Sequence, residues 1–128
     1  CSIAQKAAEA AYTGDQACVE TMRQAFERRR DLVVKMASEI EGFKVNKPDG
    51  AFYVFPECSS YFGKKTPKGD VIKNSADSAM YLLIEGHVAC VGGNAFGSPN
   101  CIRMSYATSE ENLIEAFKRI KNALDILK

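Results

Sequence analysis

The sequence predicts an α/β fold in which helices cover one side of a small, mostly antiparallel sheet, preceded by a long helix of the kind that joins two domains. Apolar residues recur at helical spacing in four stretches and alternate with polar residues in others. Along the chain these patterns follow the order helix, helix, strands, helix, two strands, helix. Neither an internal repeat nor a linker interrupts them, so we expect the 128 residues to form one domain with one core.

The N-terminal stretch is predicted to form two helices. Ser2 and Gln5 have the spacing of a capping box, and an alanine-rich stripe then continues to Gly14. A second helical pattern runs from about Asp15 to Glu41 and would reach about 40 Å, longer than a domain of this size needs. Because alanines bury little area, we expect the first helix to pack closely against a surface that is larger than itself or that lies outside this chain.

A hairpin and a surface loop are predicted next. Residues 43–46 and 51–55 have strand character, and Pro48-Asp49-Gly50 between them has the chemistry of a turn. These features favour an antiparallel pair. Residues 59–69 are rich in glycine and lysine, which indicates a polar surface loop.

The second half of the chain is predicted to contain two helices and two strands. Residues 75–85 form a helix, followed by a buried strand at 87–91 and another strand at 101–106. Thr108 and Glu111 mark the start of the last helix by capping-box spacing. The predicted buried faces are Ala76, Ala79, Met80 and Leu83 in the first of these helices and Leu113, Phe117, Ile120, Leu124 and Leu127 in the second.

Composition excludes several classes of function. A net charge of +1, from 17 basic and 16 acidic residues, gives no general attraction to nucleic acid or to anionic lipid. No apolar stretch approaches the roughly 20 residues of a membrane-spanning helix. Five cysteines without a C-x-x-C pair, with His87 as the one histidine, favour reduced thiols and argue against a metal site. The chain does not begin with methionine, so we expect it to be part of a longer protein.

Arg103 is the candidate binding residue. It lies in mid-strand between Ile102 and Met104, directly after a glycine-rich loop, and alternation places it opposite the apolar face. The planar guanidinium of an arginine matches a carboxylate through two parallel hydrogen bonds. The alternative is a structural ion pair with one of the acidic residues, and the strand pattern alone favours that alternative.

Three blocks in order along the chain carry a family resemblance. They are Pro48–Tyr53 (PDGAFY), His87–Gly97 (HVACVGGNAFG) and Ile102–Ser109 (IRMSYATS). Together they resemble the fold-type-I, class I/II pyridoxal-phosphate-dependent aminotransferases, most closely the bacterial aspartate aminotransferase subgroup, over essentially the whole chain. The resemblance implies that residues 1–128 are the C-terminal small domain of such an enzyme and that residues 1–14 are the end of its large domain.

The resemblance also assigns roles to residues. Arg103 corresponds to the family's arginine that binds the α-carboxylate of the substrate. The strand at residues 50–53 is implied to lie near the active-site cleft, and residues 95–97 to shape the loop before the arginine. Relatives commonly have Val-Pro-Gly where this chain has Val91-Gly92-Gly93, so we expect a more mobile loop here.

The cofactor implied by the resemblance is pyridoxal 5'-phosphate, which family members hold as a Schiff base on a lysine in a Ser-x-x-Lys motif. No serine in this chain has a lysine three residues later. We therefore expect no catalytic, cofactor-binding or metal-binding residue in this chain, no bound cofactor and no activity from it alone. The resemblance further implies a cytoplasmic homodimer whose partners are the large domain, an amino acid and a 2-oxo acid.

The substrate and two other functions stay open. Aspartate with 2-oxoglutarate is the first expectation, with aromatic, alanine, kynurenine and methionine-related substrates as alternatives. Instead of serving an enzyme, Arg103 could bind a carboxylate ligand in a non-catalytic module. The alanine stripe could equally form a permanent docking face of a structural domain.

Overall fold

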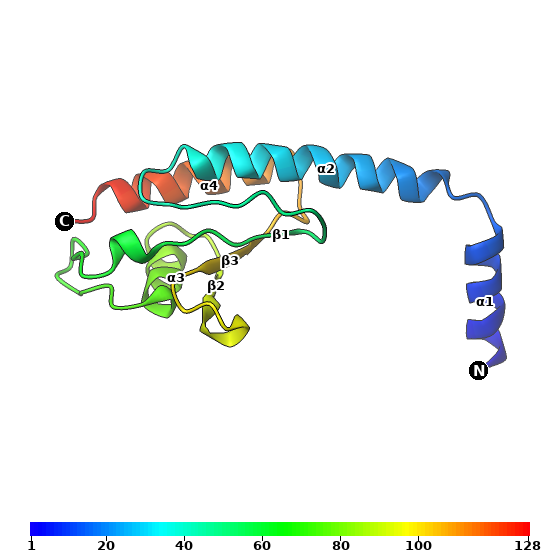
Figure 1. Cartoon of the computed structure of the whole chain (residues 1–128), viewed down its shortest axis with the longest axis horizontal. Helices are drawn as coiled ribbons and strands as arrows, with labels where there is room; N and C mark the ends of the chain where they lie inside the picture. Colours follow the sequence, from blue (N-terminus) through cyan, green and yellow to red (C-terminus); the bar gives the residue numbers. More distant parts are fainter.

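A computed structural model describes all 128 residues and contains four α-helices, two short 3-10 helices and three short strands (Figure 1). In chain order the elements are α1 (Ser2–Thr13), α2 (Ala17–Ser38), β1 (Tyr53–Val54), η1 (Ser59–Tyr61), α3 (Ser75–Ile84), β2 (Val91–Gly92), η2 (Gly93–Phe96), β3 (Ile102–Ser105) and α4 (Glu110–Asp125).

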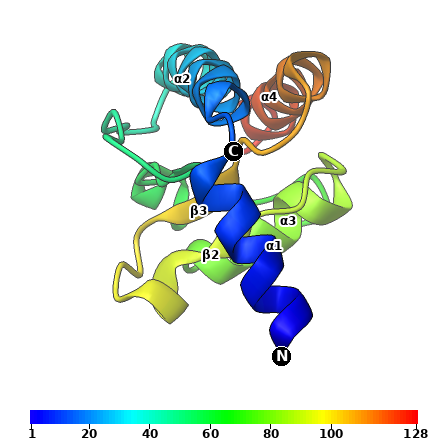
Figure 2. The same ribbon diagram turned by 90° about the vertical axis from the view of Figure 1, so that its right-hand side faces the viewer.

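The sheet has the order β1-β3-β2, and both pairings are antiparallel. In register, Tyr53 lies opposite Ser105 and Val91 opposite Arg103. Helices α2 and α4 pack side by side above the sheet, and α3 packs against β2 and β3 (Figures 1 and 2). This arrangement confirms the predicted α/β fold, with a small antiparallel sheet covered by helices and a long helix before it.

The first helix and the first part of α2 project from the rest of the molecule (Figure 1, blue). No residue of α1 is buried, and Ile3 and Tyr12 are 80% and 87% exposed. Ser2 is the first helical residue, and the predicted capping-box hydrogen bonds are absent. Within α2, burial begins only near its C-terminal end, at Val33 and Ala37. The apolar side chains of α1 therefore have no buried contacts within this chain.

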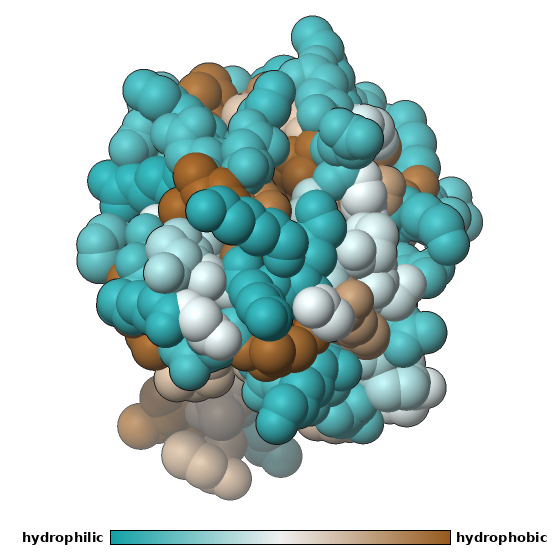
Figure 3. Space-filling view, turned by 90° about the vertical axis from the view of Figure 1, so that its left-hand side faces the viewer, coloured by the Kyte–Doolittle hydropathy of each residue, from teal (hydrophilic) through white to brown (hydrophobic).

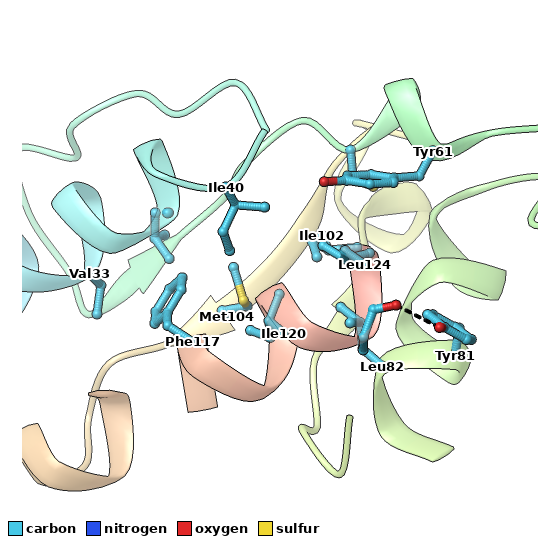
Figure 4. Close-up of a cluster of buried hydrophobic side chains, with 14 of the residues drawn as sticks. Val33, Ile40, Tyr61, Tyr81, Leu82, Ile102, Met104, Phe117, Ile120 and Leu124 are labelled. Atoms are coloured by element: carbon cyan, nitrogen blue, oxygen red, sulfur yellow. Dashed lines mark hydrogen bonds between the residues drawn. The ribbon is translucent and has the colours of Figure 1, made fainter. Parts of the chain in front are cut away.

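One core of 18 buried residues joins α2, the sheet, α3 and α4. Figure 4 shows Phe117 of α4 between Val33 of α2 and Met104 of β3. The Tyr81 hydroxyl donates a 2.6 Å hydrogen bond to the backbone oxygen of Ala123, which ties α3 to α4 inside the core (Figure 4). The predicted stripe of the last helix is confirmed, because all five of its residues are buried.

The predicted hairpin of residues 43–46 and 51–55 is wrong. Residues 43–46 form no strand, and Lys44 makes only an isolated bridge. β1 pairs instead with β3, which places Val54 beside Met104, and both side chains are buried. β1 pairs with the distant strand β3 because this pairing buries apolar area on the core side of the sheet, which a local hairpin cannot do.

The predicted face of α3 is wrong except at Ala79, which is buried. Met80 and Leu83 are 53% and 45% exposed, whereas Tyr81 and Leu82 are buried. The sequence of α3 is apolar on several sides, so periodicity alone does not choose between faces. The choice is made by packing, since Tyr81 reaches a carbonyl oxygen of α4 and Leu82 is fully covered.

The predicted buried strand at residues 87–91 is reduced to the pair Val91–Gly92, which is itself not buried. His87 is exposed and has a φ of 53°, so the chain turns sharply after α3 instead of extending. Helix ends also differ from prediction. α2 ends at Ser38 rather than at Glu41, and the side chain that caps α4 belongs to Ser109, whose hydroxyl accepts from the backbone N–H of Asn112.

The surface at the end of the molecule opposite α1 is mainly hydrophilic, with separate hydrophobic patches (Figure 3). None of the helices is both long enough and apolar enough to cross a membrane.

Cys58 and Cys90 are predicted to resist alkylation. Burial raises the pKa of both thiols from 9.0 to about 11, so at pH 8 each is ionised about a hundredfold less than an ordinary thiol. Cys1 and Cys18 are exposed. Brief treatment with iodoacetamide at pH 8, followed by peptide mass spectrometry, should label Cys18 at least about tenfold faster than Cys58. Equal rates in the folded protein would contradict this, and in urea the four rates should converge.

Candidate functional site

Arg103 lies on the face of β3 that points away from the core. Along this strand Ile102 and Met104 are buried, Arg103 is half-buried and Ser105 is exposed. The alternation predicted from the sequence is thus confirmed, and it follows from the two-residue period of a strand with one covered face.

Two aromatic rings contact the guanidinium of Arg103. Its Cζ atom is 4.5 Å from the centroid of the Tyr53 ring and 4.2 Å from that of Phe96. Tyr53 comes from β1, about fifty residues before Arg103, and Phe96 comes from the end of η2, in the loop just before β3. Contacts of this kind attract a cation to the electron-rich face of a ring.

No acidic side chain pairs with Arg103. The ion pairs of the chain all involve other basic residues, and the Arg103 side chain donates no hydrogen bond to the protein. A structural ion pair within this chain, the alternative considered from the sequence, is therefore not what holds this arginine. A guanidinium has five N–H donors, and no acceptor within this chain occupies those of Arg103.

The loop that carries Phe96 is anchored at Gly93, which is buried. The Gly93 N–H lies 2.7 Å from the backbone oxygen of Cys101 and 3.2 Å from the hydroxyl of Ser75, and the Gly93 oxygen accepts from the N–H of Ser98 at 3.1 Å. A Cβ atom at position 93 would lie 2.0 Å from the backbone oxygen of Ser98. Only glycine fits there, so this close approach sets the course of η2.

Gly92, where relatives commonly have proline, has φ of −61° and ψ of 141°. These angles lie within the range that proline imposes. The loop therefore follows the path that a Val-Pro-Gly sequence would give, and the greater mobility expected from glycine stays a prediction.

Tyr53 is held through the turn that precedes it. Ala51 has a left-handed φ of 59°, and its oxygen accepts a 3.0 Å hydrogen bond from the Tyr106 hydroxyl. The Tyr106 N–H donates to the oxygen of Phe52 at 2.9 Å. The ring of Phe26 packs against both Phe52 and Tyr106, at centroid distances of 6.1 and 6.4 Å. Helix α2 and the end of β3 thus fix the turn from which Tyr53 reaches Arg103.

The site brings together the two segments that the family resemblance placed near the active-site cleft and the arginine. The strand at residues 50–53 and the loop at residues 95–97 both reach Arg103, through Tyr53 and Phe96, whereas Ala95 and Gly97 are exposed. Direct ring contacts were not expected from the sequence, because the pairing of β1 with β3 was not visible there. A pocket of about 580 Å³ between the loop at residues 66–74 and α3 lies apart from this site.

The description of the matching family model is "Aminotransferase class I and II", and the match covers residues 1–120. The chain belongs to this family. Aspartate aminotransferase from Rhizobium meliloti is 47% identical over 126 residues, which are 98% of this chain and 31% of that protein. A bifunctional aspartate and glutamate/aspartate-prephenate aminotransferase from Petunia hybrida is 47% identical over 131 residues, 99% of this chain and 27% of that protein.

Two of the solved structures that match this chain are also aminotransferases. The crystal structure of the Rhizobium meliloti aspartate aminotransferase matches with a TM-score of 0.95 and 46% identity, over 99% of this chain and 32% of that one. An aromatic aminotransferase from Pyrococcus horikoshii matches with a TM-score of 0.73 and 38% identity, over 85% of this chain and 27% of that one. The chain thus spans about a third of the length of the proteins that it matches.

The family and its aspartate subgroup, expected from three sequence blocks, are thereby confirmed. Aminotransferases of classes I and II depend on pyridoxal phosphate, so the expected cofactor of the full-length enzyme is confirmed with the family. None of the lysines of this chain follows a serine at the Ser-x-x-Lys spacing, and the absence of cofactor-binding residues from this chain stays a prediction. The candidate binding group of this chain is Arg103, whose N–H donors meet no acceptor within the chain.

Proposed function

We propose that this chain is the C-terminal small domain of a pyridoxal-phosphate-dependent aminotransferase and that Arg103 binds the α-carboxylate of the amino-acid substrate. The unpaired guanidinium of Arg103, held on a strand between two rings, is the observation that carries the proposal. Ile102-Arg103-Met104-Ser105-Tyr106-Ala107 also matches the block that contains the carboxylate-binding arginine in the family.

In this role Arg103 orients the substrate and does not react. Two parallel N–H donors bind the two carboxylate oxygens, which fixes the direction of the bond from the carboxylate to the α-carbon. A fixed α-carbon presents its hydrogen in one direction, and such alignment contributes a large part of catalysis. Pyridoxal phosphate, bound by residues outside this chain, supplies the electron sink.

Aspartate as amino donor and 2-oxoglutarate as acceptor are the proposed substrates. The proposal is supported by the names of the relatives from Rhizobium meliloti and Petunia hybrida, both of which include aspartate aminotransferase. We further propose that the full-length enzyme is a cytoplasmic homodimer, as the family resemblance implies.

The boundary of the domain is also part of the proposal. We assign residues 1–14 to the large domain and the rest of the chain to the small domain. The assignment is supported by α1, whose residues are all exposed here and whose apolar side chains, such as Ile3 and Tyr12, would be covered by the large domain.

The test compares aspartate with its α-amide as amino donors for the full-length enzyme and for Arg103→Lys. The amide lacks the α-carboxylate charge but keeps the side chain. Lysine keeps the positive charge of Arg103 but loses the planar fork. We expect the preference of the enzyme for aspartate over the amide, measured as a ratio of kcat/KM, to fall about 10- to 150-fold, the value of one charge-assisted hydrogen bond.

Arg119→Lys is the matched control. Arg119 pairs with Glu115 on the surface of α4, and its substitution should leave the preference unchanged. An unchanged preference in Arg103→Lys would show that this arginine does not bind the α-carboxylate. Failure of the wild-type enzyme to use any amino acid as donor would refute the proposed activity itself.

A further inference from the structure

The manner in which Arg103 is held is unusual for an arginine on a strand. Arginines at such positions are commonly fixed by a carboxylate or a carbonyl oxygen that accepts their N–H groups. Here no oxygen of the chain accepts from the guanidinium, and its nearest described partners are the rings of Tyr53 and Phe96, at 4.5 and 4.2 Å. Within this chain, the rings are therefore the groups that can orient the guanidinium.

The two kinds of partner differ in what they leave for a ligand. An acidic partner would occupy the N–H donors in the plane of the guanidinium and would have to be displaced by an incoming carboxylate. A ring over the face of the guanidinium attracts the positive charge without using any N–H. Aromatic contacts can thus fix the group while its donors stay available.

From this we infer that Tyr53 and Phe96 are positioning residues that hold the guanidinium of Arg103 in the orientation required by the substrate carboxylate. The inference rests on the proposed function of Arg103 and adds to it the means by which the arginine is oriented. Neither ring is required to touch the substrate.

Both rings are themselves supported. Phe96 meets the ring of Phe55 edge to face, with centroids 6.2 Å apart, at the tip of the loop anchored by Gly93. Tyr53 packs against Phe52, with centroids 4.6 Å apart, and its backbone is paired with β3 opposite Ser105. The two rings belong to different elements, β1 and η2, and each packs against a further ring, so Arg103 is contacted from two elements.

The test measures steady-state kinetics with aspartate for four variants of the full-length holoenzyme: Phe96→Leu, Phe96→Tyr, Tyr53→Leu and Tyr53→Phe. Leucine keeps an apolar side chain but removes the ring, whereas the aromatic replacements keep it. We expect each leucine variant to raise KM for aspartate about tenfold, with kcat changed less than about threefold, because the contact to the carboxylate is made before and during reaction alike. The aromatic variants should stay within about twofold of wild type.

Loss of a ring elsewhere provides the control. Phe43 is half-buried and meets Tyr61 edge to face at 5.9 Å, so Phe43→Leu should lower stability to a similar degree without raising KM. Phe96 is 45% exposed at a loop tip, and its variants should fold. Should Tyr53→Leu fail to fold, the Phe96 pair alone decides.

The outcomes separate the inference from the proposed function. If Phe96→Leu keeps the KM of wild type, or if Phe96→Tyr is as impaired as Phe96→Leu, aromatic positioning is wrong even when Arg103→Lys loses its preference for aspartate over the α-amide. If Arg103→Lys keeps that preference, the role of Arg103 itself is wrong. Raised KM in both leucine variants with rescue by both aromatic variants supports the inference.

Discussion

Replacing Arg103 by leucine is expected to lower kcat/KM for aspartate about 30- to 4,000-fold in the full-length enzyme. The range corresponds to about 2 to 5 kcal/mol for removing one partner of a hydrogen-bonded charge pair. Leucine removes both the charge and the two parallel hydrogen bonds, so the loss should exceed that of Arg103→Lys. No other basic side chain of this chain contacts the Tyr53 or Phe96 rings, so none can replace the lost charge of Arg103.

The measurement is initial-rate amino transfer to 2-oxoglutarate, with the protein content of pyridoxal phosphate determined in parallel. Cofactor content should equal that of wild type, since Arg103 is not proposed to hold the cofactor. Arg119→Leu removes an exposed arginine that pairs with Glu115 on the solvent-facing side of α4, and this variant should have full activity. Full activity of Arg103→Leu would refute the carboxylate assignment.

Replacing Phe117 by alanine is expected to destabilise the domain by about 3 to 5 kcal/mol. Phe117 is only 5% exposed and lies where α4 meets α2 and the sheet, so its removal leaves a cavity at the junction of three elements (Figure 4). The loss is the sum of the missing transfer free energy and the cost of that cavity. In a domain of ordinary stability this is a large fraction of the whole.

Urea denaturation of the full-length enzyme, followed by circular dichroism, checks this value. Ile114 lies on the same helix and is 49% exposed, so Ile114→Ala should change the free energy of unfolding by less than about 1 kcal/mol. Phe117→Leu should fall between the two, because it keeps most of the apolar volume. A loss below about 1 kcal/mol for Phe117→Ala would mean that the core is not packed around this ring.

The sequence predicted helices better than it predicted strand pairing. All five residues of the stripe from Leu113 to Leu127 were predicted correctly, because the apolar residues of a helix with one buried face recur at helical spacing. The strand at residues 51–55 was predicted with the wrong partner, because β1 pairs with a strand about fifty residues away and the turn chemistry at Pro48–Gly50 does not indicate that pairing. α3 shows the remaining limit: where apolar residues surround a helix, only its neighbours decide which are buried.

The candidate site was predicted in part for the same reason. Arg103 could be singled out, since a charge in mid-strand opposite an apolar face is visible in the alternation. Its freedom from acidic partners could not be predicted, because the 16 acidic residues are spread along the chain and their positions in space follow from the fold. The contacts with Tyr53 and Phe96 depend on two pairings across the sheet, which the blocks of family resemblance do not show.

The central place of β3 in the sheet has a consequence for how the site forms during folding. Tyr53 on one side and the η2 loop on the other are joined to Arg103 only when β3 has entered between β1 and β2. The pairing of β1 with β3 joins residues about fifty positions apart and closes a long loop, so we expect it to form slowly compared with α2 or α4. We therefore expect Arg103 to gain the Tyr53 ring after the helices have formed. We therefore expect a carboxylate to bind at Arg103 only in chains whose sheet is complete.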